Sequence, residues 1–355
     1  VDFSRIQQRK NEVIEQLRGG IRTLLSQPNI TLIEGSAEFV DANTIKVGDE
    51  LFTADNIIIA TGSHTKLPPF AVEGMQSAKT KVVTSTELLD IESVPPTLAI
   101  VGAGVIGMEF ASAFNTFGSK VDVYEFLPEC LPAIDKDIAR RLRKSLEKRG
   151  VKFHMKYSVG NVDDLGADVV LIATGRAANT DGLALEKAGI SYDRKGITVD
   201  DNMLTNVAGV YAVGDVNGRS MLAHAAEWQG RRAVNHIIGE HDDIRFDIMP
   251  SAIFTYPEAA CVGPAESELK EKGVEYAVHK SFYRANGKAL AIGETEGMMK
   301  IITDTSDRVI SCHGYGAHAA DLIQEVSALM NKEITLRQLH DIIHIHPTLS
   351  EILVQ

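Results

Sequence analysis

The sequence predicts an α/β fold with two doubly wound units and a carboxyl-terminal α+β domain. Three observations support this prediction. Two continuous apolar runs, at 56–60 and 167–173, both end in the phrase Ala-Thr-Gly. A glycine-rich turn at 102–107 joins an apolar strand to a helix. Beyond residue 249 the strand and helix patterns are mixed rather than alternating.

The amino-terminal part begins with a predicted helix. Apolar side chains in residues 3–26 recur at intervals of three, four and seven, and Pro28 follows them. Residues 30–55 have the short segments and turn residues of an antiparallel meander. The run 56–60 is apolar throughout, so we expect a buried strand in a sheet that is covered on both faces.

Gly102, Gly104 and Gly107 form a G-x-G-x-x-G motif. The surrounding elements are a strand at 98–101, a helix from Met108 to about Phe117, a strand at 120–124 and an acid, Glu125. A glycine motif alone is weak evidence. The order strand, turn, helix, strand and acid is typical of a dinucleotide-binding unit.

Each residue of this motif has a physical role in binding a dinucleotide. Gly102 allows the tight turn, and Gly104 lets the backbone approach a pyrophosphate. Gly107 lets the helix pack on the strand, while helix N–H groups face the anion. Glu125 would bind the adenosine ribose hydroxyls and repel a 2′-phosphate, so the motif favours NAD over NADP. The alternative is a glycine turn of an unrelated α/β sheet, with Glu125 solvated.

Further strands follow the NAD-type unit. A strand at 209–213 precedes Gly214 and Asp215, whose carboxylate could bind ligand hydroxyls or could cap a helix or turn. In the carboxyl-terminal part we expect strands at 275–282, 298–303 and 309–315, and helices at 319–331 and 335–343.

Composition excludes several classes of partner. The formal charge is -12, with 36 Lys and Arg against 48 Asp and Glu, which disfavours nucleic acid and anionic membranes as partners. The most apolar window, 98–114, is interrupted by three glycines and Glu109, so we expect no transmembrane helix. No signal-type segment follows Val1, and we expect a cytoplasmic protein whose amino terminus is cut or incomplete.

The sequence holds few candidate metal ligands. Its three cysteines, Cys130, Cys261 and Cys312, are too far apart for a local clamp or a disulfide scaffold. His340 and His344 have helical ligand spacing, with His346 and Asp341 nearby, but the H-E-x-x-H motif is missing. We therefore expect no metal site.

The phrase HIHPTLSE, at 344–351, leaves two further interpretations open. Pro347 is expected as the first residue of a terminal helix, with His346 as a helix cap and Glu351 as a first-turn acid. Alternatively, His346 is a base, because an imidazole titrates near neutrality and a carboxylate such as Glu351 can fix its tautomer.

Four stretches resemble the flavin-dependent pyridine nucleotide–disulfide oxidoreductases. They are Thr205–Asp215, Phe254–Glu258, Ala285–Ala289 and His346–Glu351. The likeness covers essentially the whole chain in order, and within the family it is greatest to the dihydrolipoamide dehydrogenase branch. Glutathione reductase is the nearest competitor, but Glu125 speaks against its usual preference for NADP.

The resemblance implies two Rossmann-like dinucleotide-binding domains, an incomplete one for FAD and one for NAD, and a carboxyl-terminal α+β dimerisation domain. The implied segments are 1–92 for the remaining FAD domain, 93–178 for the NAD domain, 179–248 for the FAD-domain return and central segment, and 249–355 for the interface domain.

The resemblance also implies site residues. For NAD they are Gly102, Ala103, Gly104, Val105, Ile106, Gly107, Glu109, Glu125, Val159 and Gly175. For FAD they are Ala37, Thr61, Gly62, Ser63, Asp215, Met221, Leu222, Ala223 and His224. His346 would be the catalytic base that deprotonates a thiol, and Glu351 its orienting partner, in the active site of a homodimer.

The implied reaction is FAD-dependent oxidation of dihydrolipoamide by NAD+, serving the lipoyl-bearing acyltransferase of 2-oxoacid dehydrogenase complexes. Two departures qualify it. The family's first glycine fingerprint and its Cys-x4-Cys pair do not precede Val1, so the chain as written would be inactive. The segment 157–167 is also too short for the family's strand excursion, and we expect missing residues near 159–167. The alternatives are a glutathione-reductase-like enzyme and a redox-inactive, NAD-binding dimer.

Overall fold

The computed structural model describes residues 1–355, which form two compact units. Unit 1 consists of Val1–Lys66, Asp90–Ser93 and Arg176–Ile244, and unit 2 consists of Leu67–Leu89, Val94–Gly175 and Arg245–Gln355. The predicted NAD-binding and interface domains therefore share unit 2. None of the helices is both long and apolar enough to cross a bilayer.

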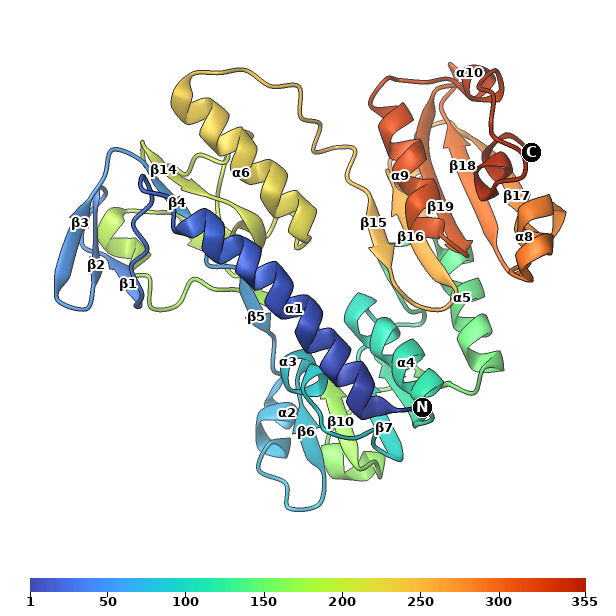
Figure 1. Ribbon diagram of the computed structural model, residues 1–355, viewed down its shortest axis with the longest axis horizontal. Coiled ribbons are helices and arrows are strands. Elements are labelled where there is room, and N and C mark those ends of the chain that lie inside the picture. The colour runs from blue at the N-terminus through green and yellow to red at the C-terminus, as the bar shows by residue number, and fades with distance from the viewer. The chain divides into compact units, whose positions relative to one another are not determined.

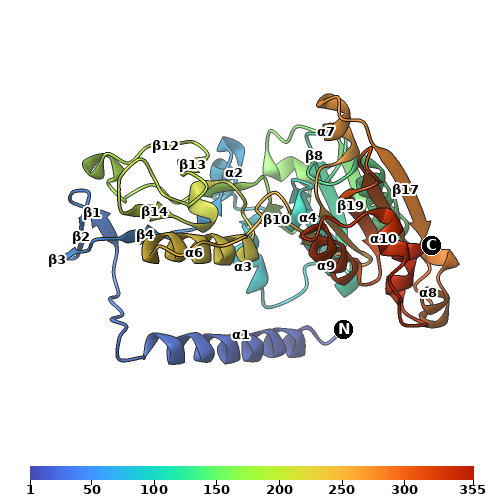
Figure 2. The same cartoon turned by 90° about the horizontal axis from the view of Figure 1, so that it is seen from above.

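Unit 1 begins with α1 (Phe3–Leu25), the long helix drawn in blue in Figures 1 and 2, and it confirms the helix predicted at 3–26. Asp2 caps it by accepting a hydrogen bond from the Arg5 N–H. The first turns are tied to residues 90–93, because the Gln7 side chain donates to the Ile91 carbonyl at 2.8 Å. No residue of α1 is buried, so its apolar stripe remains accessible.

The predicted meander is also confirmed. It consists of the antiparallel strands β1 (Ala37–Phe39), β2 (Thr44–Val47) and β3 (Glu50–Thr53). The next strand, β4 (Ile57–Ile59), pairs in parallel with β14 (Val210–Ala212), and α6 (Ala223–Ile238) lies beside this pair in both views (Figures 1 and 2).

The expectation that the 56–60 strand is covered on both faces is wrong. Ile59 is buried, but Ile58 is 40% exposed. The reason is that β4 and β14 form a sheet of only two strands, whose core of apolar side chains lies on one side. Shorter elements complete unit 1: β5 (Ser63–Thr65) with β11 (Arg176–Ala178), β12 (Tyr192–Asp193) with β13 (Gly196–Ile197), and the 3-10 turns η2 (Leu185–Ala188) and η3 (Gly214–Asn217).

The first sheet of unit 2 is fully parallel, in the order β6-β10-β7-β8-β9. Its strands are β6 (Lys81–Val83), β7 (Thr97–Val101), β8 (Lys120–Glu125), β9 (Lys152–Met155) and β10 (Val169–Ile172). The helices are α2 (Pro69–Gly74), α3 (Ser85–Leu89), α4 (Val105–Phe117) and α5 (Lys136–Lys148). The edge strand β6 belongs to this sheet, although it lies before residue 93, where the NAD domain was predicted to begin. The short segment 157–167 contains the 3-10 turn η1 (Val162–Leu165).

The second sheet of unit 2 is antiparallel, in the order β15-β16-β19-β18-β17. Its strands are β15 (Ser251–Ile253), β16 (Glu258–Val262), β17 (Ala277–Phe282), β18 (Met298–Thr303) and β19 (Val309–Gly316). The helical elements are α7 (Glu266–Glu271), η4 (Tyr283–Ala285), α8 (Gly287–Ile292), α9 (Ala319–Met330), α10 (Leu336–His340) and η5 (Leu349–Val354).

Three strands and α9 of this part confirm the prediction, and α9 packs on the sheet over a core of buried apolar side chains. The helix predicted at 335–343 ends earlier, at His340, because the chain turns away there and Ile343 is 97% exposed. Strands β15 and β16 were not predicted, since they are short and flank Pro257.

Candidate dinucleotide and dithiol sites

The glycine turn has the shape that the sequence predicts. Gly102 has φ 108°, and a Cβ there would lie 2.3 Å from the Ala173 carbonyl oxygen. A Cβ on Gly107 would lie 1.9 Å from the Gly102 carbonyl oxygen. Gly104 has nothing within 4 Å of its Cβ position, so the space beside it is open. Only glycine fits at 102 and 107, whereas 104 leaves room for a ligand.

Glu125 holds this turn from the end of β8. Its Oε2 accepts a hydrogen bond from the Ala103 N–H at 2.6 Å, and its Oε1 accepts one from the Leu127 N–H at 2.7 Å. The helix α4 begins at Val105, three residues earlier than predicted, and no side chain caps its amino terminus. Its first N–H groups are therefore suited to an anion such as a pyrophosphate, and the residues present fit NAD.

The other residues predicted to contact NAD differ in their surroundings. Val105 is 39% exposed, and Ile106 is half-buried beside it. Gly175 is exposed, with φ 109°, beyond the end of β10. Val159 is 8% exposed and packs in the core of the parallel sheet, so only its backbone is available to a ligand. Glu109 accepts a hydrogen bond from the Phe254 N–H at 2.9 Å, and burial raises the pKa of its carboxyl.

In unit 1 two of the residues predicted to contact FAD, Ser63 and Asp215, meet beyond the ends of β4 and β14. The Ser63 hydroxyl donates to Asp215 Oδ2 at 2.5 Å. Arg176 donates from Nε to the Ser63 hydroxyl and from its terminal nitrogen to the Ser63 carbonyl, both at 2.6 Å. Arg176 was not predicted, although it directly follows the second Ala-Thr-Gly phrase, and that was the signal available. This cluster of carboxylate, hydroxyl and guanidinium fits a polyhydroxyl chain such as the ribityl group.

Asn179 fixes the neighbouring turn at 61–62. Its side-chain amide donates to the Thr61 carbonyl and the Thr61 hydroxyl donates to the Asn179 carbonyl, both at 2.8 Å, while Gly62 has φ 72°. The remaining predicted residues, Met221, Leu222, Ala223 and His224, lie at the start of α6, shortly after Asp215. Ala37 is exposed at the start of β1 in the meander, and no contact brings it to Asp215.

His346 and Glu351 lie together at the carboxyl terminus. His346 Nδ1 is 2.9 Å from Glu351 Oε1, while the imidazole is 78% exposed. Glu351 Oε2 accepts the Thr348 N–H at 2.9 Å, and this bond, followed by the bond with His346, lowers the pKa of the Glu351 carboxyl. Because a carboxylate only accepts, His346 in its neutral form carries its proton on Nδ1 and presents Nε2 as a base.

Pro347 does not begin a helix as predicted. The peptide bond before it is cis, and Thr348 is the residue that precedes η5. Thr348, and not His346, therefore caps η5. Glu351 is an acid of the first turn of η5, and its other carboxylate oxygen contacts His346. The role of His346 as a base stays a prediction.

The histidines considered as metal ligands are separated. His344 is bound to Glu325 Oε1 at 3.1 Å and to the Ile342 carbonyl at 2.9 Å, whereas His346 pairs with Glu351. No group of three or more His, Cys, Asp or Glu side chains in the protein is arranged to hold a metal ion.

The three cysteines are buried and unpaired. Burial raises the pKa of all three thiols, that of Cys261 to about 12. A buried thiol of high pKa is a poor nucleophile, so these cysteines do not supply dithiol chemistry.

The class of protein that these folds and sites define is a dinucleotide-linked oxidoreductase. Residues 2–230 match the pyridine nucleotide-disulphide oxidoreductase family, and residues 249–355 match the dimerisation domain of that family. The chain belongs to the pyridine nucleotide-disulphide oxidoreductase family.

Relatives agree along nearly the whole chain. A dihydrolipoyl dehydrogenase of Chlamydia muridarum is 35% identical over 99% of this chain and 79% of the relative, and the mitochondrial dihydrolipoyl dehydrogenase 1 of Arabidopsis thaliana is 36% identical over 99% and 74%. Among solved structures, the HOCl-induced flavoprotein disulfide reductase RclA from Escherichia coli superposes with a TM-score of 0.90, at 31% identity over 99% of this chain and 85% of that one.

These similarities confirm several predictions. The chain is an oxidoreductase similar to dihydrolipoyl dehydrogenases, and the cofactors of this family are FAD and NAD(H). The mixed α/β fold with a dimerisation domain is confirmed, and that domain supports a homodimer.

Proposed function

We propose that the protein oxidises dihydrolipoamide to lipoamide, with FAD as bound redox group and NAD+ as hydride acceptor, and that it serves the lipoyl-bearing acyltransferase of 2-oxoacid dehydrogenase complexes. The observation that carries the proposal is the exposed His346–Glu351 pair, whose Nδ1–Oε1 distance is 2.9 Å. FAD supplies the two-electron chemistry between a dithiol and a nicotinamide. Its site includes Asp215, Ser63 and the start of α6.

The His346 imidazole takes a proton from a thiol at Nε2, because only the thiolate exchanges with a disulfide. Glu351 stabilises the imidazolium that forms, and the Thr348 N–H keeps the carboxylate oriented. The exposure of His346 leaves the base open to a thiol of the substrate dihydrolipoamide. Gly102, Gly104 and Gly107 with Glu125 bind NAD in the proposal, and the Glu125 carboxylate disfavours a 2′-phosphate.

We also propose a cytoplasmic location, since unpaired buried cysteines suit a reducing compartment.

The decisive experiment compares two reactions of the full-length protein, NAD+ reduction by dihydrolipoamide and glutathione disulfide reduction by NADPH. The proposal expects the first reaction to dominate and to fall about 100-fold or more in His346→Gln, with little change in the KM for NAD+. Dominant NADPH-linked activity would favour a glutathione-reductase-like enzyme. A colourless protein that binds NAD without either activity would instead identify a redox-inactive dimer.

A further inference from the structure

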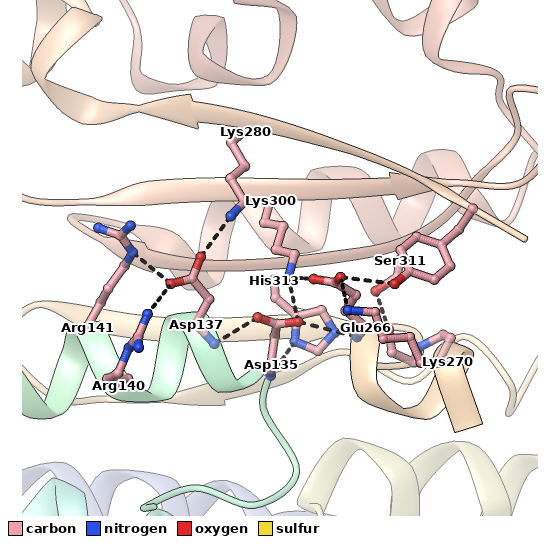
Figure 3. A network of polar contacts seen from close by, with 12 residues as sticks. Asp135, Asp137, Arg140, Arg141, Glu266, Lys270, Lys280, Lys300, Ser311 and His313 are labelled. Carbon is pink, nitrogen blue, oxygen red and sulfur yellow. Dashed lines mark hydrogen bonds and ion pairs between the residues drawn. The ribbon is translucent and has the colours of Figure 1, made fainter. Parts of the chain in front are cut away.

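Lys300 of β18 is a fully buried cation in unit 2, outside the glycine turn and the His346 pair. Its side chain is 1% exposed, and Nζ donates to Asp135 Oδ2 at 2.7 Å and to Glu266 Oε2 at 2.6 Å (Figure 3). Burial lowers the pKa of Lys300, but the bonds with both carboxylates outweigh it and the net shift is upward. Removing one carboxylate partner of a buried ammonium is destabilising, because it leaves part of the buried charge uncompensated.

Asp135 is held by two adjacent strands of the antiparallel sheet, β18 and β19. Its side chain also caps α5, through Oδ1 and the Asp137 N–H at 3.0 Å. Its backbone N–H donates to His313 Nδ1 at 3.1 Å, and His313 of β19 is completely buried. His313 Nε2 in turn donates to the Pro264 carbonyl at 3.3 Å. Asp135 is therefore held by the charged Lys300 side chain of β18 and by the hydrogen bond of its backbone N–H to His313 of β19.

The segment that ends at Asp135 reaches the glycine turn. The Leu131 N–H donates to the Ala103 carbonyl at 2.9 Å, and the Ile134 N–H donates to the Leu131 carbonyl at 2.9 Å. Leu131 is 2% exposed and has φ 49°, a left-handed conformation that a branched side chain adopts only when its surroundings impose it. The backbone of Leu131 is constrained by its hydrogen bond to Ala103 on one side and by the contacts that hold Asp135 on the other.

We propose that Lys300 is a positioning residue for NAD: by anchoring Asp135 it fixes the segment 131–135, which supports the Ala103 carbonyl and keeps the glycine turn in the shape that receives the pyrophosphate. This inference rests on the proposed NAD site. Lys300 touches no ligand, and its effect reaches the turn through Leu131.

Lys280 offers a matched control. It lies directly opposite Lys300 in the β17–β18 pairing, and its Nζ donates to Asp137 Oδ2 at 2.8 Å. Asp137 is in the first turn of α5, the helix that Asp135 caps. Lys280 is 38% exposed, and Asp137 is also bound by Arg141 at 3.1 Å. Its bond holds the helix α5 rather than the segment 131–135.

The experiment measures NAD+ affinity by calorimetry and thermal melting on the full-length protein and on Lys300→Met, Asp135→Asn, their double variant and Lys280→Met. We expect Lys300→Met and Asp135→Asn each to weaken NAD+ binding about fivefold, with no further loss in the double variant, whereas Lys280→Met changes it less than about twofold. In steady state the KM for NAD+ should rise with kcat nearly unchanged, and Lys300→Arg should restore part of the affinity.

A lowered melting temperature with wild-type NAD+ affinity in Lys300→Met would show that the contacts of Lys300 serve only the stability of the fold, and this result would overturn the inference. If Lys300→Met yields no folded protein, Asp135→Asn decides alone, since its side-chain oxygen can still cap α5. Wild-type protein without NAD+ binding would defeat the proposed function and this inference together, whereas equal binding by wild type and variants would defeat only the inference.

Discussion

Alanine substitutions at Gly104 and Gly107 should have different effects, because the first glycine leaves room for the ligand and the second allows the helix to pack on the strand. In Gly107→Ala the new Cβ would lie 1.9 Å from the Gly102 carbonyl oxygen and 3.3 Å from Ile100 Cγ2. Real contacts of this kind are not shorter than 3.0 Å, so the backbone must yield by about 1 Å. Overpacking against backbone costs about 3 kcal/mol, and the better helix propensity of alanine returns about 1 kcal/mol.

The net loss of about 2 kcal/mol corresponds to a fall in Tm of roughly 4–8 °C for a cooperative unit of about 200 residues such as unit 2. Gly104 has φ -76° and open space around its Cβ position. Gly104→Ala should therefore keep or slightly raise the Tm, because alanine restricts the unfolded chain. Its methyl group would stand where the pyrophosphate approaches, so NAD+ affinity should fall at least about tenfold.

The assay is thermal melting with and without NAD+, paired with calorimetric titration of NAD+ into each variant. Equal NAD+ affinity in Gly104→Ala and wild type would refute the assignment of the open space to the pyrophosphate. An unchanged Tm in Gly107→Ala would refute the packing argument.

Three further results are expected. Glu351→Gln should lower dihydrolipoamide oxidation, because the imidazolium of His346 loses a negative partner; an unchanged rate would contradict that role. The three cysteines should react with a thiol reagent such as DTNB only after unfolding, and rapid labelling of any of them in the native chain would contradict their burial. Burial lowers the pKa of His313, the Asp135 carboxylate raises it, and the Lys300 charge lowers it further; the net shift is downward. As the pH falls, the unfolded chain therefore binds a proton at this histidine before the folded chain does. Stability should therefore be full above pH 6.5 and fall as the pH drops below it, and His313→Asn should lose less over this range.

The sequence predicted the elements with strong local signals. The glycine turn was predictable because Gly102 and Gly107 have a steric requirement that only glycine meets. The binding of a ribose by Glu125 stays a prediction. Ile58 was predicted incorrectly, because an apolar run reveals nothing about how many strands join it or on which side they pack. The end of α10 was missed for a similar reason, since Ile343 continues the apolar pattern although the backbone has already left the helix.

Long-range polar contacts were beyond the reach of the sequence. Lys300 stands in a run of strand residues, and its partner Asp135 lies 165 positions earlier in the chain, at the start of helix α5. Arg176 and Asn179 likewise act on Thr61 and Ser63 across more than one hundred positions. Such contacts depend on topology, and no local period encodes them.

The two hydrogen bonds of Glu351 also limit how this position can vary. An aspartate would be too short to reach both the Thr348 N–H and His346, and a glutamine could satisfy the backbone but would carry no charge for the imidazolium. Any residue without both reach and charge would release either the start of η5 or the base. Tolerance to substitution at 351 is thus restricted twice over, once by folding and once by chemistry, and a change that spares one requirement still fails the other.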